Sequence, residues 1–119
     1  MLGSKVALIV DDEIFARLMM TQILMDDDYC VLEASNAAEA LDVLDRNDDV
    51  ELLITDISMP GELDGLDLAR NVLSHHPRMM TVLTSGFRTP AEDELPGRAR
   101  FLPKPYTAHA LRSIIRQCG

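Results

Sequence analysis

Short apolar runs alternate along the chain with segments in which apolar residues recur every three or four positions. Five runs have the length and the apolar character of buried strands: residues 5–10, 29–34, 50–55, 79–84 and 100–103. Helical spacing marks residues 14–25, 37–44 and 66–73 and the segment after Thr107. This alternation predicts an α/β fold in which helices cover both faces of a doubly wound, five-stranded parallel sheet.

Polar residues mark several helix ends. Asn36, followed three residues later by Glu39, resembles a capping box, and Thr107 can cap the last helix. The third helix must stop before Pro77, so His75 and His76 fall at a helix end, where partial positive charge is favourable. We therefore interpret the two histidines as part of a helix end rather than as a metal site or a phosphodonor.

The interval between the fourth and fifth strands is poor in helix signals. Pro90 can begin a helix, but Pro96 and Gly97 end it almost at once. Residues 91–95, which remain between the two prolines, make barely more than one turn, well below the about 12 residues that an isolated helix needs in water. The sequence therefore predicts a short or mobile fourth helix.

Length and charge narrow the class of protein. The 119 residues suffice for one compact domain, residues 1–119, and 47% of them are hydrophobic. The net charge of −9 argues against a nucleic-acid partner, because phosphate contacts need clustered Lys and Arg. No apolar run approaches the about 20 residues of a bilayer span. With no signal-peptide pattern, we expect a cytoplasmic protein without a membrane partner, in which Cys30 and Cys118 are unpaired thiols.

Polar side chains follow four of the predicted strands. Asp11 and Asp12 follow the first strand, Asp56 the third, Thr84 ends the fourth and Lys104 follows the fifth. The carboxyl ends of parallel strands meet at one edge, where such folds bind ligands. Three carboxylates there would repel one another and raise at least one pKa unless a cation lies among them, and Mg²⁺ prefers such oxygen ligands.

The same residues also have structural interpretations. Asp11 and Asp12 could cap a helix, Asp56 could belong to a turn, and Thr84 and Lys104 could be ordinary strand-end residues. Their joint placement favours a functional site instead. A metal, a hydroxyl and an ammonium group around one carboxylate are suited to phosphoryl transfer onto that carboxylate.

The motifs at these strand ends resemble those of the receiver domains of two-component response regulators. They stand in the same order along nearly the whole chain: Val10-Asp11-Asp12-Glu13, Ile54-Thr55-Asp56-Ile57-Ser58-Met59-Pro60, Asp64-Gly65-Leu66, Leu83-Thr84-Ser85-Gly86 and Leu102-Pro103-Lys104-Pro105. The resemblance implies a flavodoxin-like fold with strand order 2-1-3-4-5. The wording Thr-Ser-Gly and Leu-Pro-Lys-Pro-Tyr is similar to that of receivers attached to hybrid histidine kinases.

The resemblance also implies a role for each residue. The chain would take a phosphoryl group from a histidine kinase or a phosphotransfer protein and then control a downstream protein that the sequence does not identify. It would catalyse only its own phosphorylation and dephosphorylation. The implied roles are Asp56 as phosphoacceptor and metal ligand, Asp12 as direct and Asp11 as water-mediated Mg²⁺ ligand, the Ser58 carbonyl as a further ligand, Lys104 and Thr84 as phosphoryl contacts, and Phe101 as the aromatic switch.

One departure and several alternatives remain. The loop between Asp56 and Asp64-Gly65 is one residue longer than is usual in the family, which should alter its shape but not its chemistry. An aspartyl-phosphate phosphatase would carry Asp-x-Asp after the first strand, where this chain has adjacent aspartates. A flavin-binding module would need a phosphate loop there, for which two acids are the wrong charge. A phosphorylation-independent pseudo-receiver would not need the complete set of chemical groups.

Overall fold

The computed structural model describes residues 5–118, in which five strands alternate with helices. In chain order the elements are β1 (Lys5–Val10), α1 (Ile14–Asp26), β2 (Tyr29–Ala34), α2 (Ala37–Arg46), β3 (Val50–Asp56), α3 (Gly65–His75), β4 (Met80–Ser85), η1 (Glu92–Glu94), β5 (Arg100–Pro103) and α4 (Ala108–Cys118). Strand β4 begins and ends one residue later than its apolar pattern predicts. No helix within residues 5–118 is long and apolar enough to cross a membrane.

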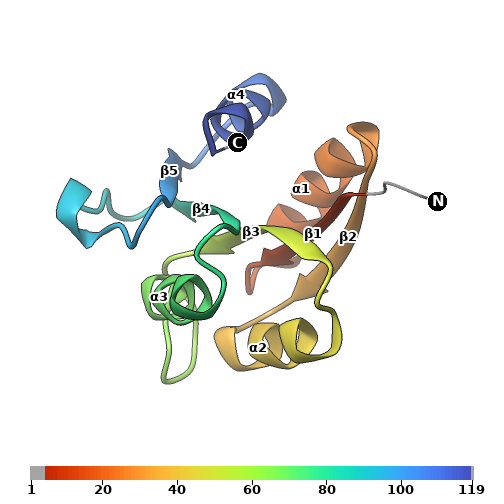
Figure 1. The fold of residues 1–119 in the computed structure, drawn as a ribbon. Coiled ribbons are helices and arrows are strands. Elements are labelled where there is room, and N and C mark those ends of the chain that lie inside the picture. The colour runs from red at the N-terminus through yellow and green to blue at the C-terminus, as the bar shows by residue number, and fades with distance from the viewer. Residues whose placement is uncertain (1–4, 119) are drawn as a thin grey trace.

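The five strands form one parallel sheet between two layers of helices (Figure 1). The strand order is β2-β1-β3-β4-β5, which confirms the order that the family resemblance implies. Helices α1 and α4 lie on one side of the sheet, and α2 and α3 lie on the other. The α/β fold class predicted from the alternating pattern is therefore confirmed.

The alternation of side chains along β1 shows how the sheet serves both layers. Ala7 and Ile9 pack with Met20 and Leu24 of α1 and with Leu111 of α4. All five side chains are buried. Successive side chains of a strand point to opposite faces. The side chains of Leu8 and Val10 therefore point to the other layer of helices.

On that second side, Leu8 and Val10 of β1 pack with Ala40 of α2 and with Leu68 and Val72 of α3. Both faces of β1 are thus apolar, as expected for a central strand of a sheet that is covered twice. The polar residues at the carboxyl ends of the strands therefore stand out against the apolar residues in the middle of the central strands.

The helix ends follow the predicted caps with one difference. The Asn36 side chain accepts a hydrogen bond from the Glu39 N–H at 2.8 Å. In return, the Glu39 carboxylate accepts from the N–H of Ser35 at 3.2 Å and not from Asn36, so the capping box is shifted by one residue. The Thr107 hydroxyl accepts from the Ala110 N–H at 3.0 Å, which confirms the cap of the last helix.

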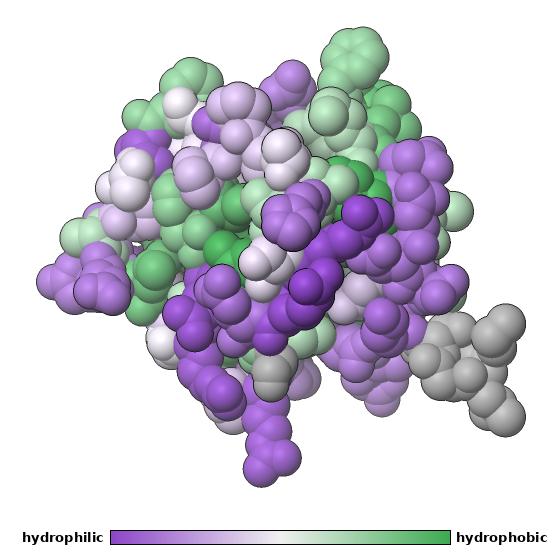
Figure 2. All heavy atoms as spheres, turned by 90° about the horizontal axis from the view of Figure 1, so that it is seen from above, coloured by the Kyte–Doolittle hydropathy of each residue, from purple (hydrophilic) through white to green (hydrophobic). Residues whose placement is uncertain are grey.

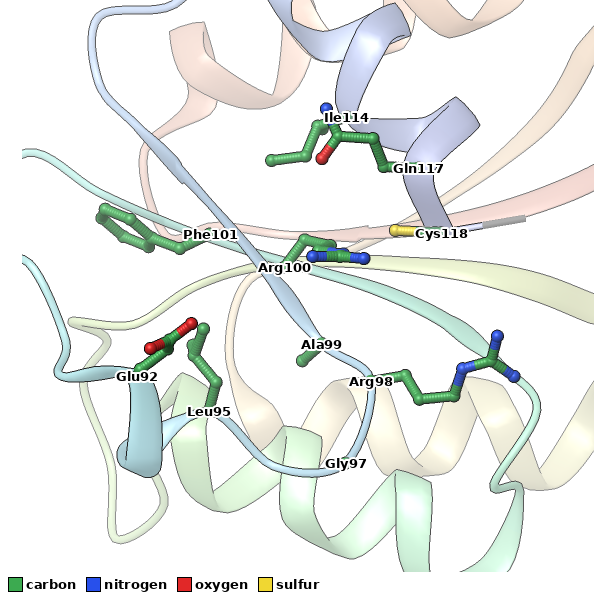
Figure 3. Close-up of a pocket in the computed structure, with 10 residues that line it drawn as sticks. All are labelled: Glu92, Leu95, Gly97, Arg98, Ala99, Arg100, Phe101, Ile114, Gln117 and Cys118. Atoms are coloured by element: carbon green, nitrogen blue, oxygen red, sulfur yellow. The ribbon is translucent and has the colours of Figure 1, made fainter.

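The region between β4 and β5 contains only one turn of 3-10 helix, η1. Pro90 and Pro96 bracket this turn, so the short fourth helix is confirmed, and its mobility stays a prediction. A cavity of about 460 Å³ opens between η1, β5 and the end of α4. Figure 3 shows Leu95 and Phe101 on one side of it and Gln117 on α4 on the other. The short turn leaves this side of β5 open.

Helix α1 carries apolar residues on the side that faces away from the sheet. Its exposed large apolar residues, in chain order, are Ile14, Phe15, Leu18, Met19 and Met25. Figure 2 views the molecule from above this layer and shows apolar groups open to solvent among hydrophilic ones. Of the six apolar positions that give the 14–25 pattern its helical spacing, four therefore face outward. We call this set of five residues the α1 apolar face.

Candidate functional site

The ends of four strands bring the predicted polar residues to one edge of the sheet. Asp56 is the last residue of β3 and lies in register with Thr84 of β4. Asp11 and Asp12 directly follow β1, and Lys104 directly follows β5. Strands β1, β3, β4 and β5 are neighbours in the sheet, so residues up to 93 positions apart in sequence come within hydrogen-bond distance.

Three carboxylates form the centre of the site. One carboxylate oxygen from each of Asp11, Asp12 and Asp56 lies within 4.8 Å of the other two. Asp11 and Asp56 are buried, whereas Asp12 is exposed. Three hard oxygen donors with one open side fit a divalent cation such as Mg²⁺, which binds one or two carboxylates and keeps several waters.

Lys104 bridges two of these carboxylates. Its Nζ donates a hydrogen bond to Asp11 Oδ2 at 2.8 Å and lies 3.6 Å from Asp56 Oδ1. The shorter contact is therefore to Asp11, and the contact with the phosphoryl group that the family resemblance implies for this lysine stays a prediction. Burial alone would lower the pKa of Lys104, but the hydrogen bond to Asp11 and the charge of Asp56 raise it above its ordinary value. The lysine therefore stays a cation.

Burial is the main influence on the pKa of the Asp56 carboxylate. Burial, opposed by the charge of Lys104 and reinforced by the charges of Asp11 and Asp12, raises the pKa of Asp56 to about 6. A raised pKa agrees with the expectation for crowded carboxylates. The leading cause is desolvation rather than the mutual repulsion on which that expectation rested.

The loop between β3 and α3 is anchored next to Asp56. Gly65, the first residue of α3, donates its N–H to the carbonyl of Ile57 at 2.8 Å. A Cβ atom at Gly65 would overlap the main-chain carbonyl of Asp56, so only glycine allows α3 to approach β3 this closely. Asp64 caps α3 in a reciprocal capping box with Asp67. The longer loop therefore still ends in a fixed contact with the main chain at Asp56 and Ile57.

Tyr106 closes the side of the site next to α1. Its hydroxyl donates to Met20 Sδ at 3.7 Å. Burial, together with the charges of Asp11 and Asp56, raises the pKa of Tyr106 to about 12. The phenol therefore stays neutral and adds no further negative charge to the carboxylates.

Other predicted residues lie around this centre. Ser58 is exposed in the bend after β3, and Phe101 is half-buried on β5 beside the cavity of Figure 3. Their roles as metal ligand and switch stay predictions.

His75 ends α3 and His76 follows it, both exposed, as the helix-end interpretation predicts. The side chain of Asp11 accepts a hydrogen bond from the Glu13 N–H at 2.9 Å. The N-cap residue of α1 is Glu13 and no side chain caps this helix, so the interpretation of Asp11 as a helix cap is wrong.

Sequence reasoning missed Arg17. This α1 residue donates from Nη1 to the main-chain carbonyl of Asp11 at 2.7 Å and from Nε to the Glu33 carboxylate at 3.2 Å. A signal was present, because positions 17, 20 and 24 share one helix face, and Met20 and Leu24 are apolar. A charged residue on the inner face of a helix calls for a partner.

Comparison with known proteins identifies the family. Residues 7–116 match the family described as the response regulator receiver domain. The chain therefore belongs to the response-regulator receiver domains of two-component systems, as its motifs predict. Such domains are signalling switches rather than conventional enzymes.

Relatives of two kinds share its sequence. The chain is 33% identical to the sensor kinase CckA of Brucella abortus over 122 residues, which cover 97% of the chain and only 12% of the kinase. It is 34% identical to a chemotaxis protein CheY homolog of Campylobacter jejuni over 114 residues, covering 88% of the chain and 85% of that protein. The match is thus to a small part of a kinase or to nearly all of a CheY-type protein.

Solved structures share the fold over nearly the full length. A response regulator receiver protein from Sinorhizobium medicae superposes with a TM-score of 0.86 at 26% identity, covering 99% of this chain and 96% of that one. A receiver domain protein from Clostridium thermocellum gives a TM-score of 0.83 at 28% identity, with 96% and 93% covered.

Proposed function

We propose that residues 1–119 form one receiver domain that accepts a phosphoryl group on Asp56 with the help of Mg²⁺. The observation that carries this proposal is the grouping of Asp11, Asp12 and Asp56 within 4.8 Å of one another, with the Lys104 ammonium 3.6 Å from the acceptor oxygen. Such a group places a nucleophile, a cation site and a fixed positive charge around one point. These are the components of phosphoryl transfer by positioning and charge stabilisation.

The carboxylates and one main-chain carbonyl would hold the metal. Asp12 and Asp56 would bind Mg²⁺ directly, Asp11 through water, and Ser58 through its carbonyl oxygen. A bound Mg²⁺ supplies charge that offsets the repulsion between these carboxylates and the incoming phosphoryl oxygens.

The transfer itself makes one bond and breaks one. A carboxylate oxygen of Asp56 attacks the phosphorus of a phosphohistidine. As the new oxygen–phosphorus bond forms, the nitrogen–phosphorus bond breaks and the imidazole nitrogen keeps the electron pair. Lys104 would move from its closer contact with Asp11 to pair with the phosphoryl oxygens, and Thr84 would donate its hydroxyl to them. Phe101, next to the open side of β5, would turn inward as Thr84 moves.

The phosphodonor would dock beside the acceptor on the α1 apolar face. A groove of about 480 Å³ joins this face to the site, and among the residues that line it are Phe15, Met19, Phe87, Lys104 and Tyr106. Phe87 is 91% exposed, so this groove offers apolar surface that a partner protein can bury. A histidine on a helix of a kinase or of a phosphotransfer protein could reach Asp56 from it.

The test is labelling by a small phosphodonor, acetyl phosphate, followed by mass spectrometry of the intact and digested chain. We expect one phosphoryl group per chain, on Asp56, in Mg²⁺ and none after chelation. Asp56→Asn should abolish labelling without loss of fold, whereas the exposed Asp42→Asn, matched in chemistry, should label fully. Labelling of Asp56→Asn would refute the assignment, and a phosphoryl group on Asp11 or Asp12 would favour a phosphatase-type enzyme.

A further inference from the structure

Arg17 is a half-buried cation on the inner side of α1 whose contacts lead to the carboxylate cluster. Its side chain is only 17% exposed. The guanidinium contacts two groups from different elements, the Asp11 carbonyl at 2.7 Å and the Glu33 carboxylate of β2 at 3.2 Å. A planar guanidinium suits this task, because its donors point in fixed directions and can hold two acceptors at once.

The Asp11 carbonyl lies where the chain leaves the sheet. The N–H of Asp11 still pairs with the carbonyl of Ala34 at 3.1 Å, which continues the β1–β2 ladder by one residue. The carbonyl of Asp11 takes no part in the β1–β2 ladder. It takes no part in α1 either, because the first helical hydrogen bond runs from the Arg17 N–H to the carbonyl of Glu13. Among residues 5–118, Arg17 is the one hydrogen-bond donor to this carbonyl.

The side chain of the same residue is held from two other directions. Asp11 Oδ1 accepts from the Glu13 N–H at 2.9 Å, and Oδ2 accepts from Lys104 at 2.8 Å. Four hydrogen bonds therefore hold the main-chain turn at residues 11–13: the last bond of the β1–β2 ladder and the contacts of Asp11 with Glu13, Lys104 and Arg17. Asp12, which presents the third carboxylate, lies within this turn.

We infer that Arg17 is a positioning residue for the metal site. It does not reach the carboxylates of the cluster, but it fixes the turn that presents Asp11 and Asp12 to the cation. Glu33 in turn holds the guanidinium in place. This inference rests on the proposed function, because it assigns Arg17 a role in Mg²⁺ binding by this same site.

The charge of Arg17 and its positioning role predict opposite changes in Mg²⁺ affinity when the residue is replaced. Arg17 is positive, so its removal alone would lessen repulsion toward a divalent cation and tighten Mg²⁺ binding. Loss of the hydrogen bond to the Asp11 carbonyl would instead loosen the turn and weaken binding. Removal of a group that orients metal ligands commonly lowers affinity by about 10–100-fold. The sign of the change therefore distinguishes the two effects.

The experiment measures Mg²⁺ affinity by isothermal titration calorimetry on the full chain, at a temperature where circular dichroism shows each variant folded. Arg17→Met should weaken Mg²⁺ binding by about tenfold. Arg17→Lys, which keeps the charge but cannot hold both acceptors, should lie between Arg17→Met and the unchanged chain. The matched control is Arg112→Met, which removes an equal charge and a 2.9 Å ion pair to Asp27 far along the same layer. It should lower Tm yet leave the Mg²⁺ affinity within about twofold.

The outcomes separate this inference from the proposed function. Absence of Mg²⁺ binding by the unchanged chain would overturn the proposed function and the inference with it. Equal or tighter binding by folded Arg17→Met would overturn the inference alone. If Arg17→Met does not fold, Glu33→Gln replaces it, because it keeps Arg17 and weakens only the anchor of the guanidinium. That variant should lose Mg²⁺ affinity by a smaller factor, and unchanged affinity would overturn the inference.

Discussion

Asp12 differs from the two carboxylates beside it, because it is exposed while Asp11 and Asp56 are 5% and 7% exposed. Lys104 contacts the two buried carboxylates and not Asp12. Asp12 therefore adds negative charge to the cluster and has no cation of its own among the described residues. Without a metal its charge should oppose folding, and with a metal it should contribute a ligand.

Asp12→Asn tests this balance, since it removes the charge and nearly keeps the shape. In metal-free buffer we expect a Tm higher by on the order of 2 °C, because a repulsive exposed pair is worth a fraction of 1 kcal/mol. Added Mg²⁺ should raise the Tm of the unchanged chain and hardly that of the variant. The control Asp42→Asn, on the exposed side of α2, should keep the full response to Mg²⁺. A substantial fall of Tm for Asp12→Asn in metal-free buffer would contradict a crowded carboxylate cluster.

Gly65 permits the close contact between α3 and the carbonyl of Asp56. Alanine is the better helix former, so helix propensity alone predicts that Gly65→Ala stabilises the chain. The overlap of its Cβ with the Asp56 carbonyl predicts the reverse, a loss of about 1–3 kcal/mol in the free energy of unfolding. Urea denaturation measures this difference.

Gly86→Ala is the matched control for that substitution. A Cβ atom at Gly86 would lie 3.6 Å from the Cβ of Lys104, an ordinary contact, and the position is exposed. Its effect should stay within about 0.5 kcal/mol. A stabilised Gly65→Ala variant would show that the helix can retreat from β3 without strain.

At the scale of elements, the strands were predictable because apolar runs and the polar residues after them follow directly from a doubly covered sheet. The same reasoning brought Asp56, Thr84 and Lys104 together, since parallel strands end at one edge. It could not predict which carboxylate Lys104 approaches more closely, because the sequence pattern does not determine side-chain torsion angles. Helix α1 shows the other limit. It is apolar on both sides, so its pattern could not show that Phe15 faces solvent or that Arg17 faces the sheet.

The segment between β4 and β5 should be the least protected part of the described chain. Its main-chain hydrogen bonds at η1 and beyond are few, from Glu94, Leu95 and Ala99 to carbonyls three residues earlier. The ion pair between Arg88 and Glu94, at 2.7 Å, is exposed and adds little. We expect amide hydrogens of residues 87–98 to exchange at least about tenfold faster than those of α3.

Hydrogen exchange read by mass spectrometry measures this difference, with α3 as the internal control because it flanks the same end of the sheet. The segment joins Thr84 to Phe101 and Lys104, so a phosphoryl mimic bound at Asp56 should slow its exchange. Protection equal to that of α3 in the unphosphorylated chain would contradict a mobile segment.

At the scale of the whole molecule, the beginning of the α1 apolar face lies at the same end of the structure as Asp56 and Lys104. The net charge of −9 keeps most of the surface polar, yet Phe15, Met19 and Phe87 stay exposed beside the groove that leads to Lys104. Burying such a face against a partner is the ordinary source of interface energy, which concentrates in a few large side chains. A small phosphodonor needs none of it. Protein and small-molecule donors should therefore respond differently to changes on this face.

Phe15→Glu puts a charge on the part of the α1 apolar face that lines the groove. With a phosphorylated histidine-kinase or phosphotransfer domain, chosen from a panel as the one that labels the unchanged chain fastest, we expect transfer to slow by at least about tenfold. Labelling by acetyl phosphate should change much less, because the carboxylates and Lys104 are untouched. Met25→Glu is the control, since Met25 belongs to the same apolar face and is 58% exposed but does not line the groove and lies ten residues, or about 15 Å, further along α1. Equal slowing by Phe15→Glu and Met25→Glu would point to a general effect of added negative charge. Unchanged transfer to Phe15→Glu would place the docking surface elsewhere.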